Sequence, residues 1–213
     1  MKKWINWVIP LVVVLVLVSY GFTPKEVKVP ESLKVTEPMV VDYPKREEVN
    51  LDLFMIAPPF LGTSFIGFRE ALAFKESQGN YFTTNTLGYL GKYQFGIGTL
   101  QLMGVYNATR FLNNPKLQEE AFQTNIARNK WILRRDIARF EGKYVAGVEV
   151  TESGILAAAH LAGPGNVKKY LRSYGAIDFE DTYGTSMSHY MRKFSGYDVS
   201  HVSPVRNPKV PKI

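Results

Sequence analysis

A nearly uninterrupted apolar run opens the chain and limits where the rest of it can fold. The run extends from Trp4 to Phe22 and follows Lys2 and Lys3. Its roughly 19 residues approach the ~20 that an α-helix needs to cross a bilayer. Because lysines ahead of such a segment stay cytoplasmic, we expect the remainder of the chain to be exported. Residues 1–23 are therefore predicted to be a signal anchor or a signal peptide. We favour the anchor, since no A-x-A cleavage pattern is present.

A proline-rich segment follows, over residues 24–59. Six prolines interrupt a mixture of Lys, Glu and Val that has no helical period. Such a composition is typical of an extended stalk, which at about 3 Å per residue could reach on the order of 100 Å from a membrane. Short edge strands near Val27–Val29 or Met39–Val41 are the alternative.

Composition narrows the classes of partner. The chain has 213 residues, enough for one domain of about 150 residues with appendages. Its net charge of +7 favours anionic partners, such as membrane headgroups or acidic cell-wall polymers. No dense basic run is present, so nucleic acid is not expected as a partner. The absence of cysteine excludes disulfides and thiolate metal sites.

The folded part is expected over residues 60–200, and its class is predicted to be α+β, mainly α. Apolar residues recur at helical spacing, and residues 81–95 leave room for a small hairpin. Residues 201–213 are basic and proline-spaced, so we expect a flexible tail. Four capping residues predict helix starts: Thr99, Asn114 before Pro115, Thr151 and Ser186.

One carboxyl group stands out at the end of a predicted helix. Glu76 follows the apolar residues Phe68 and Leu72 and precedes Gly79, a typical helix stop. The partial negative charge of a helix C-terminus favours the protonated form of a carboxyl group. Together with an aromatic cleft, this position suits a general acid, although such a residue is more often a solvated surface charge.

Three motifs in order resemble those of the lytic transglycosylase and goose-type lysozyme superfamily. They are Glu76-Ser77, the stretch Gly91-Lys92-Tyr93-Gln94, and AAAHLAGPGN over residues 157–166. The family shows Glu-Ser at a helix end, a Gly-x-x-Gln hairpin and an Ala-Tyr-Asn-Ala-Gly-Pro-Gly helix stop. A late helix with Tyr190 matches a fourth family element. The resemblance covers about residues 60–197 and implies a lysozyme-like fold.

Two of these motifs depart from the family pattern. His160-Leu161 stands where the family has Tyr-Asn, and Lys92-Tyr93 stands where it has Leu-Met. The departures put substrate contacts in doubt, but they leave the proton donor in place.

The resemblance implies cleavage of the β-1,4 bond between N-acetylmuramic acid and N-acetylglucosamine in peptidoglycan. Glu76 would protonate the glycosidic oxygen and then act as base on the muramoyl C6 hydroxyl, closing a 1,6-anhydro ring. No cofactor or metal is needed. The implied site residues besides Glu76 are Ser77, Gln94, Tyr93, His160 and Tyr190. Since neighbours in a strand face opposite sides, we expect only one of Tyr93 and Gln94 to line the groove, and the motif favours Gln94.

Two other functions remain open. A muramidase-type hydrolase needs a second carboxylate to activate water. The candidates are Glu152, Asp178, Glu180 and Asp181, of which Glu152 fits better as first-turn helix charge and the others as a solvated loop. A non-catalytic peptidoglycan-binding module of an envelope assembly is the other alternative. In each case we expect the domain on the periplasmic or extracytoplasmic side, anchored in the inner membrane by residues 4–22.

Overall fold

The computed structural model describes residues 61–182 and 184–211. The predicted anchor, over residues 1–23, and the stalk, over residues 24–59, lie outside this range. None of the helices within the described residues is long and apolar enough to span a bilayer.

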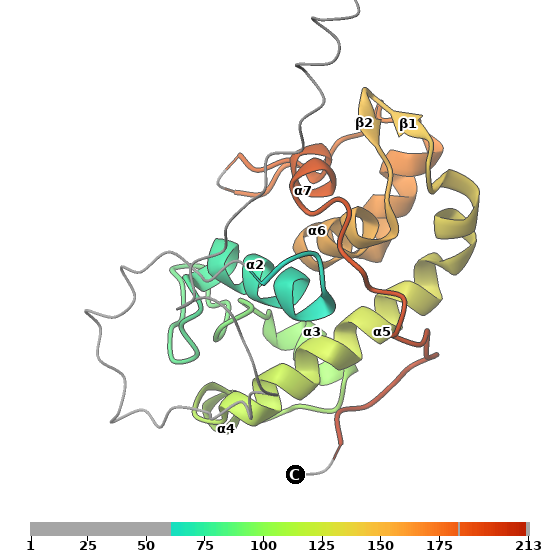
Figure 1. The fold of residues 1–213 in the computed structure, drawn as a ribbon. Coiled ribbons are helices and arrows are strands. Elements are labelled where there is room, and N and C mark those ends of the chain that lie inside the picture. Colours follow the sequence, from blue (N-terminus) through green and yellow to red (C-terminus); the bar gives the residue numbers. More distant parts are fainter. Residues whose placement is uncertain (1–60, 183, 212–213) are drawn as a thin grey trace, which may run out of the picture. The chain divides into compact units, whose positions relative to one another are not determined.

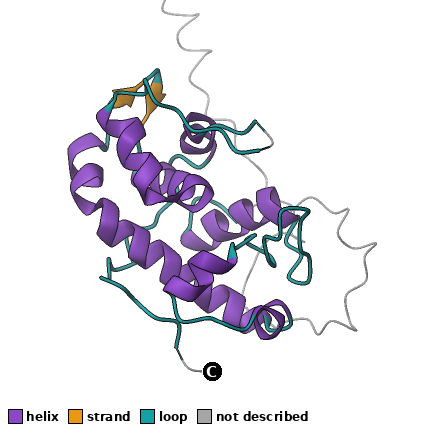
Figure 2. Ribbon diagram, turned by 180° about the vertical axis from the view of Figure 1, so that it is seen from behind, coloured by secondary structure: helices purple, strands orange, loops and turns teal. Residues whose placement is uncertain are grey.

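The described residues are mainly helical, as the sequence predicted, and their one small antiparallel hairpin lies outside the segment where a hairpin was expected (Figures 1 and 2). The elements in chain order are α2 (Phe65–Ser77), α3 (Ile97–Leu102), α4 (Ala108–Leu112), α5 (Pro115–Phe140), β1 (Tyr144–Val145), β2 (Val148–Glu149), α6 (Glu152–Arg172) and α7 (Met187–Lys193).

Capping side chains fix most helix starts. Asn114, Thr151 and Ser186 each accept a backbone hydrogen bond three residues on, which confirms three of the four predicted starts. The prediction for Thr99 is wrong, because α3 begins at Ile97 after Gly96. The expected stop at the Gly-Pro-Gly sequence is a kink instead: Gly163 takes φ 78° and the chain resumes a helical path.

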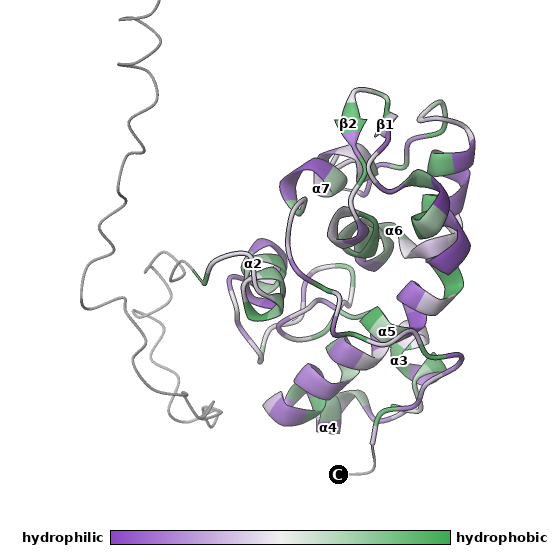
Figure 3. Cartoon of the chain, turned by 45° about the vertical axis from the view of Figure 1, so that its right-hand side comes forward, coloured by the Kyte–Doolittle hydropathy of each residue, from purple (hydrophilic) through white to green (hydrophobic). Residues whose placement is uncertain are grey.

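Helix α5 runs alongside α6 and supplies much of the core. Glu152, at the start of α6, pairs with Lys130, so α6 first runs toward the start of α5 and turns back after the kink at Gly163. Two further side-chain contacts mark this change of direction. They join His160 to Asn125 and Arg172 to Asp136. Figure 3 shows turns of α5 alternating between hydrophilic and hydrophobic residues, as expected of a helix with one buried side.

Strand pairing is confined to short stretches. The hairpin pairs Tyr144 with Glu149 and Val145 with Val148. Residues 81–95, where a hairpin was expected, form only two isolated antiparallel bridges, Thr84 with Leu90 and Leu90 with Phe95. Tight turns between these bridges leave no room for a continuous ladder.

The C-terminal segment is not a loose tail in its described part. Val202 is buried, the Val205 amide donates to the Ala127 carbonyl, and the Val210 amide donates to the Met103 carbonyl. The Lys209 ammonium also donates to the Leu102 carbonyl at 2.7 Å, so both backbone and basic side chains tie the segment to the domain. The expectation of a flexible segment from residue 201 is therefore wrong for residues 201–211.

Candidate functional site

A pocket of about 280 Å³ opens where the end of α2, the loop before α3, the middle of α6, the loop before α7 and α7 itself meet. Four of the six predicted site residues line it: Glu76, Gln94, His160 and Tyr190. The other lining residues are Lys75, Asn85, Leu87, Tyr89, Leu161, Phe179, Asp181, Thr182 and Thr185.

The acid candidate is held by a tyrosine from the last helix. The Tyr190 hydroxyl donates a hydrogen bond to Glu76 Oε1 at 2.6 Å. Burial, and then the charge of Glu76, raise the pKa of Tyr190 far above its usual value, so the phenol stays protonated. The ring packs against Phe194, with centroids 5.2 Å apart. Glu76 is half-buried and lines the pocket, and one of its two carboxyl oxygens is engaged by Tyr190.

His160 holds the loop that carries Gln94. A carbonyl can only accept, so Nε2 carries the proton and donates to the Tyr93 carbonyl at 2.8 Å. Nδ1 lies 3.4 Å from the Asn125 amide nitrogen. Burial lowers the pKa of His160, against the opposing charge of Glu76. The imidazole is therefore neutral near pH 7 and acts as a structural link between α6, α5 and the loop.

Gln94 lies on a tight turn at the pocket wall. Its backbone is left-handed, with φ 49°, and its side-chain amide donates to the Gly91 carbonyl at 2.8 Å. The half-buried side chain leaves its carbonyl oxygen available to a ligand.

Two predicted site residues lie away from the pocket. Tyr93 is fully buried, and its hydroxyl donates to Glu119 Oε2 at 2.6 Å, so of the Tyr93 and Gln94 pair only Gln94 reaches the groove. The Ser77 hydroxyl donates to the Lys92 carbonyl at 2.7 Å, which joins the helix end to the loop. Neither side chain lines the pocket.

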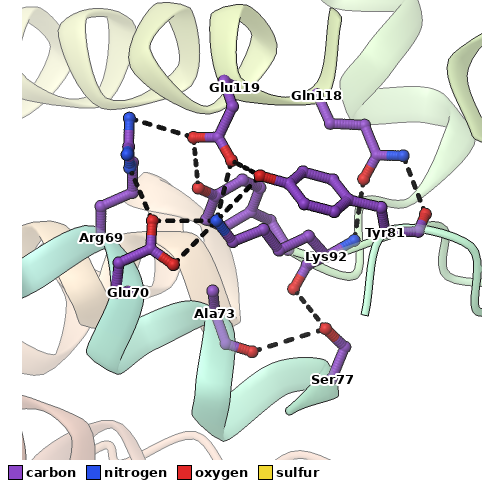
Figure 4. Close-up of polar contacts among 9 residues, drawn as sticks. Arg69, Glu70, Ala73, Ser77, Tyr81, Lys92, Gln118 and Glu119 are labelled. Carbon is purple, nitrogen blue, oxygen red and sulfur yellow. Dashed lines mark hydrogen bonds and ion pairs between the residues drawn. The ribbon is translucent and has the colours of Figure 1, made fainter. Parts of the chain in front are cut away.

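A buried network of charges lies beneath this loop, and the sequence reasoning missed it (Figure 4). The Lys92 ammonium lies between Glu70, at 2.8 Å, and Glu119, at 2.9 Å. Arg69 reaches Glu119 at 3.1 Å. The Tyr81 hydroxyl also donates to Glu119, at 2.6 Å. Lys92 is thus 4% exposed but fully paired.

The charges of the network support one another. Burial on its own would raise the pKa of Glu119, but Lys92 and then Arg69 outweigh it and hold that pKa below its usual range. Burial, followed by the charge of Glu119, raises the pKa of Tyr81 far above normal, so this phenol remains a donor. Glu119 is therefore a buried carboxylate with four donors around it.

Gln118 shapes the same loop from α5. Its side-chain oxygen accepts from the Lys92 amide at 2.8 Å, and its nitrogen donates to the Tyr81 carbonyl at 2.8 Å. Gly91 takes φ 72°, and a Cβ there would lie 2.2 Å from the Gln118 oxygen. Only glycine fits this close approach, which gives the Gly-x-x-Gln motif a packing reason.

One of the four candidates for a second carboxylate reaches the pocket. Asp181 lines it, and its Oδ1 accepts from the Thr185 amide at 2.7 Å. Asp178 and Glu180 are exposed, whereas Glu152 pairs with Lys130 at 3.1 Å. The expectation of a fully solvated acidic loop is therefore wrong for Asp181.

Comparisons with known proteins add no assignment. No protein-family model, curated protein or solved structure matches the chain significantly. Within the described part of the chain, no group of three or more His, Asp or Glu residues is arranged to hold a metal ion.

Proposed function

We propose that the chain is a peptidoglycan lytic transglycosylase with a lysozyme-like fold. It cleaves the β-1,4 bond between N-acetylmuramic acid and N-acetylglucosamine and forms a 1,6-anhydro ring. The observation that carries the proposal is the 2.6 Å hydrogen bond from Tyr190 to Glu76 inside a pocket that Gln94 and His160 also line. Residues from four separate segments converge on one carboxyl group, which is the arrangement that a positioned acid requires.

Glu76 acts first as an acid and then as a base. Its proton passes to the glycosidic oxygen while the bond from that oxygen to C1 of the muramoyl sugar breaks. The ionised carboxylate then takes the proton of the C6 hydroxyl as that oxygen bonds to C1. This step regenerates the acid and consumes no water. The Tyr190 hydroxyl keeps one carboxyl oxygen fixed throughout, so the other faces the sugar.

The histidine at the family's tyrosine position supports this chemistry indirectly. A neutral imidazole beside Glu76 neither competes for the proton nor adds a positive charge. Its hydrogen bond to the Tyr93 carbonyl fixes the turn that places Gln94. The substrate contact of the family's tyrosine therefore passes to other pocket residues, and Gln94 is the first candidate.

Location and partners follow from the same proposal. Peptidoglycan strands are the substrate, and the apolar run at residues 4–22 anchors the chain in the inner membrane with the domain outside the cytoplasm. Other proteins of an envelope complex are further partners, and nucleic acid is not.

A second candidate function is hydrolysis by a muramidase mechanism. The observation that favours it is Asp181 in the same pocket as Glu76. A second carboxylate could activate water on the opposite face of the sugar. The two functions differ in their products by one water.

The test is digestion of purified sacculi by the full chain, with mass analysis of the soluble products. We expect 1,6-anhydro products from the wild type and none from Glu76→Gln. Glu149→Gln, an exposed change on β2, is the matched control and should digest normally. Reducing-end products that disappear in Asp181→Asn would establish the hydrolase instead. Binding to sacculi without any soluble product would refute both enzymes and indicate a binding module.

A further inference from the structure

We propose that the second half of α5 forms a docking surface for anionic phospholipid headgroups, separate from the pocket. The surface, called the arginine face below, consists of exposed or half-buried residues of α5 and its neighbours. Its members are Arg128, Trp131, Arg134, Arg135, Arg139, Lys143, Tyr144, Tyr174 and Arg206.

The arginines of α5 gather on one side without acidic partners. Arg128, Arg135 and Arg139 are spaced by seven and four residues, which places them along one face of the helix. Among the described residues, none of them forms an ion pair with a carboxylate. Three acids lie nearby: Asp136 is buried and already bound by Arg172, whereas Glu141 and Glu149 are exposed and form no ion pair with these arginines in the described part of the chain. Like charges four residues apart destabilise a helix, so an external anion would relieve this repulsion.

A tryptophan lies within this cluster of guanidinium groups. The Arg134 guanidinium lies 4.1 Å from the Trp131 ring centroid, and that of Arg206 lies 5.4 Å from it. The Arg134 side chain also donates to the Trp131 carbonyl at 2.7 Å. These contacts hold both guanidinium groups beside a half-buried indole. Planar guanidinium groups pair with phosphate oxygens through two parallel hydrogen bonds.

Exposed aromatic residues also lie near the end of α5 and in the hairpin that follows it. Tyr144 is 70% exposed in the hairpin, next to Lys143. Tyr174 is 61% exposed and packs edge-on against Phe140, with centroids 5.7 Å apart. Tyrosine and tryptophan rings between basic side chains are typical of surfaces at the level of lipid headgroups.

The chain outside the described residues favours a membrane over other polyanions. Sixty residues precede Leu61, and they include the apolar run at residues 4–22 that the sequence predicts to cross a bilayer. A tethered domain experiences a high effective concentration of headgroups, so a modest surface is sufficient for docking. None of the residues of the arginine face lines the pocket. The domain could therefore dock and bind a glycan strand at the same time.

The experiment uses Trp131 as the probe in the full chain with Trp4→Phe and Trp7→Phe. The chain is reconstituted in vesicles of phosphatidylcholine alone, or of phosphatidylcholine with about one third phosphatidylglycerol. The quenching of Trp131 fluorescence by acrylamide is then measured. We expect Trp131 to be protected on the anionic vesicles only, and high salt to abolish the protection. In Arg135→Gln/Arg139→Gln the ratio of docked to undocked domain should fall about thirtyfold.

Arg110→Gln/Lys116→Gln removes the same charge from α4 and the start of α5, and this variant should keep the protection. Digestion of soluble glycan by the Arg135/Arg139 variant should match the wild type, which shows that its fold is intact. Equal quenching on both vesicle types, or an equal loss in the Arg110/Lys116 control, would overturn the proposal. Protection of Trp131 by duplex DNA at equal phosphate would overturn it in favour of a nucleic-acid surface.

Discussion

Replacing Lys92 with methionine tests whether the buried charge network stabilises the fold. Methionine has a similar length, so the change removes the ammonium and leaves little cavity. Glu119 then loses its cation at 2.9 Å while it stays 6% exposed. Removing one partner of a buried ion pair costs about 3–5 kcal/mol.

The position of Arg69 places the expected loss at the lower end of this range. Its guanidinium remains 3.1 Å from Glu119, and Glu70 is 27% exposed and can be solvated. We therefore expect a loss of about 3 kcal/mol in the free energy of unfolding. For a domain of this size, that corresponds to a fall of roughly 6–12 °C in melting temperature.

The loss should depend on pH in a defined direction. Because the pKa of Glu119 is lowered in the folded wild type, its contribution to stability is present above the unfolded-state pKa and disappears as pH falls through the folded value. Without Lys92 that pKa rises, and protonation removes the unpaired charge. The difference between Lys92→Met and wild type should therefore be larger at pH 7 than at pH 4.

The assay is urea unfolding of the full chain in a non-ionic detergent, followed by near-UV circular dichroism. The double variant Lys92→Met/Glu119→Gln keeps an acceptor for both tyrosines. It should be more stable than the sum of the single changes predicts, by about 2 kcal/mol. A Lys92→Met loss below about 0.5 kcal/mol, in the range of ordinary surface changes, would refute the reasoning. So would a loss that stays constant between pH 4 and pH 7.

Three further predictions concern the pocket and the C-terminal segment. Tyr190→Phe keeps the ring against Phe194 but removes one hydrogen bond to the Glu76 carboxyl group, so digestion should slow by about 10- to 100-fold. The melting temperature should fall only slightly, because Glu76 is half-buried and water can replace the bond; an unchanged rate would show that the bond has no catalytic part. Burial lowers the pKa of His160, so the contribution of this histidine to stability is present above its unfolded-state pKa and is lost as pH falls through its folded-state pKa. NMR should show a neutral His160 ring with the proton on Nε2 at pH 7, and a charged ring at that pH would contradict this. Val202→Ala should cost about 2 kcal/mol in urea unfolding, since Val202 is 4% exposed; a loss near zero would mean that the segment does not pack on the domain.

Local chemistry made several elements of this fold predictable. Asn114 caps the first turn of α5 and Pro115 occupies its first position, so this pair of neighbours marks the start of the helix. Thr151 and Ser186 do the same for α6 and α7. The bond between Glu76 and Tyr190 joins residues 114 apart in sequence, and only the order of the motifs pointed to it.

The charge network could not be found in the same way. Lys92 and Glu119 are 27 residues apart, and neither position carries a local signal for ion pairing. One indirect signal was available: Gln118 and Glu119 lie four and three residues before Phe122, on the side of α5 that the apolar pattern predicts to be buried. A buried position occupied by a charged residue requires a partner, and Lys92 could have been sought on that ground.

Ser77 gives this network a connection to the proposed chemistry. Its hydroxyl bonds the Lys92 carbonyl at 2.7 Å, while the Lys92 side chain is held by Glu70 and Glu119. The residue after the acid thus ties the end of α2 to the loop whose turn carries Gln94. Because Glu76 and Gln94 are positioned by contacts that never touch a ligand, small losses in the network should alter activity before they unfold the domain. Ser77→Ala should therefore lower the digestion rate more than it lowers the free energy of unfolding, and equal effects on both would mean that the serine serves only the fold.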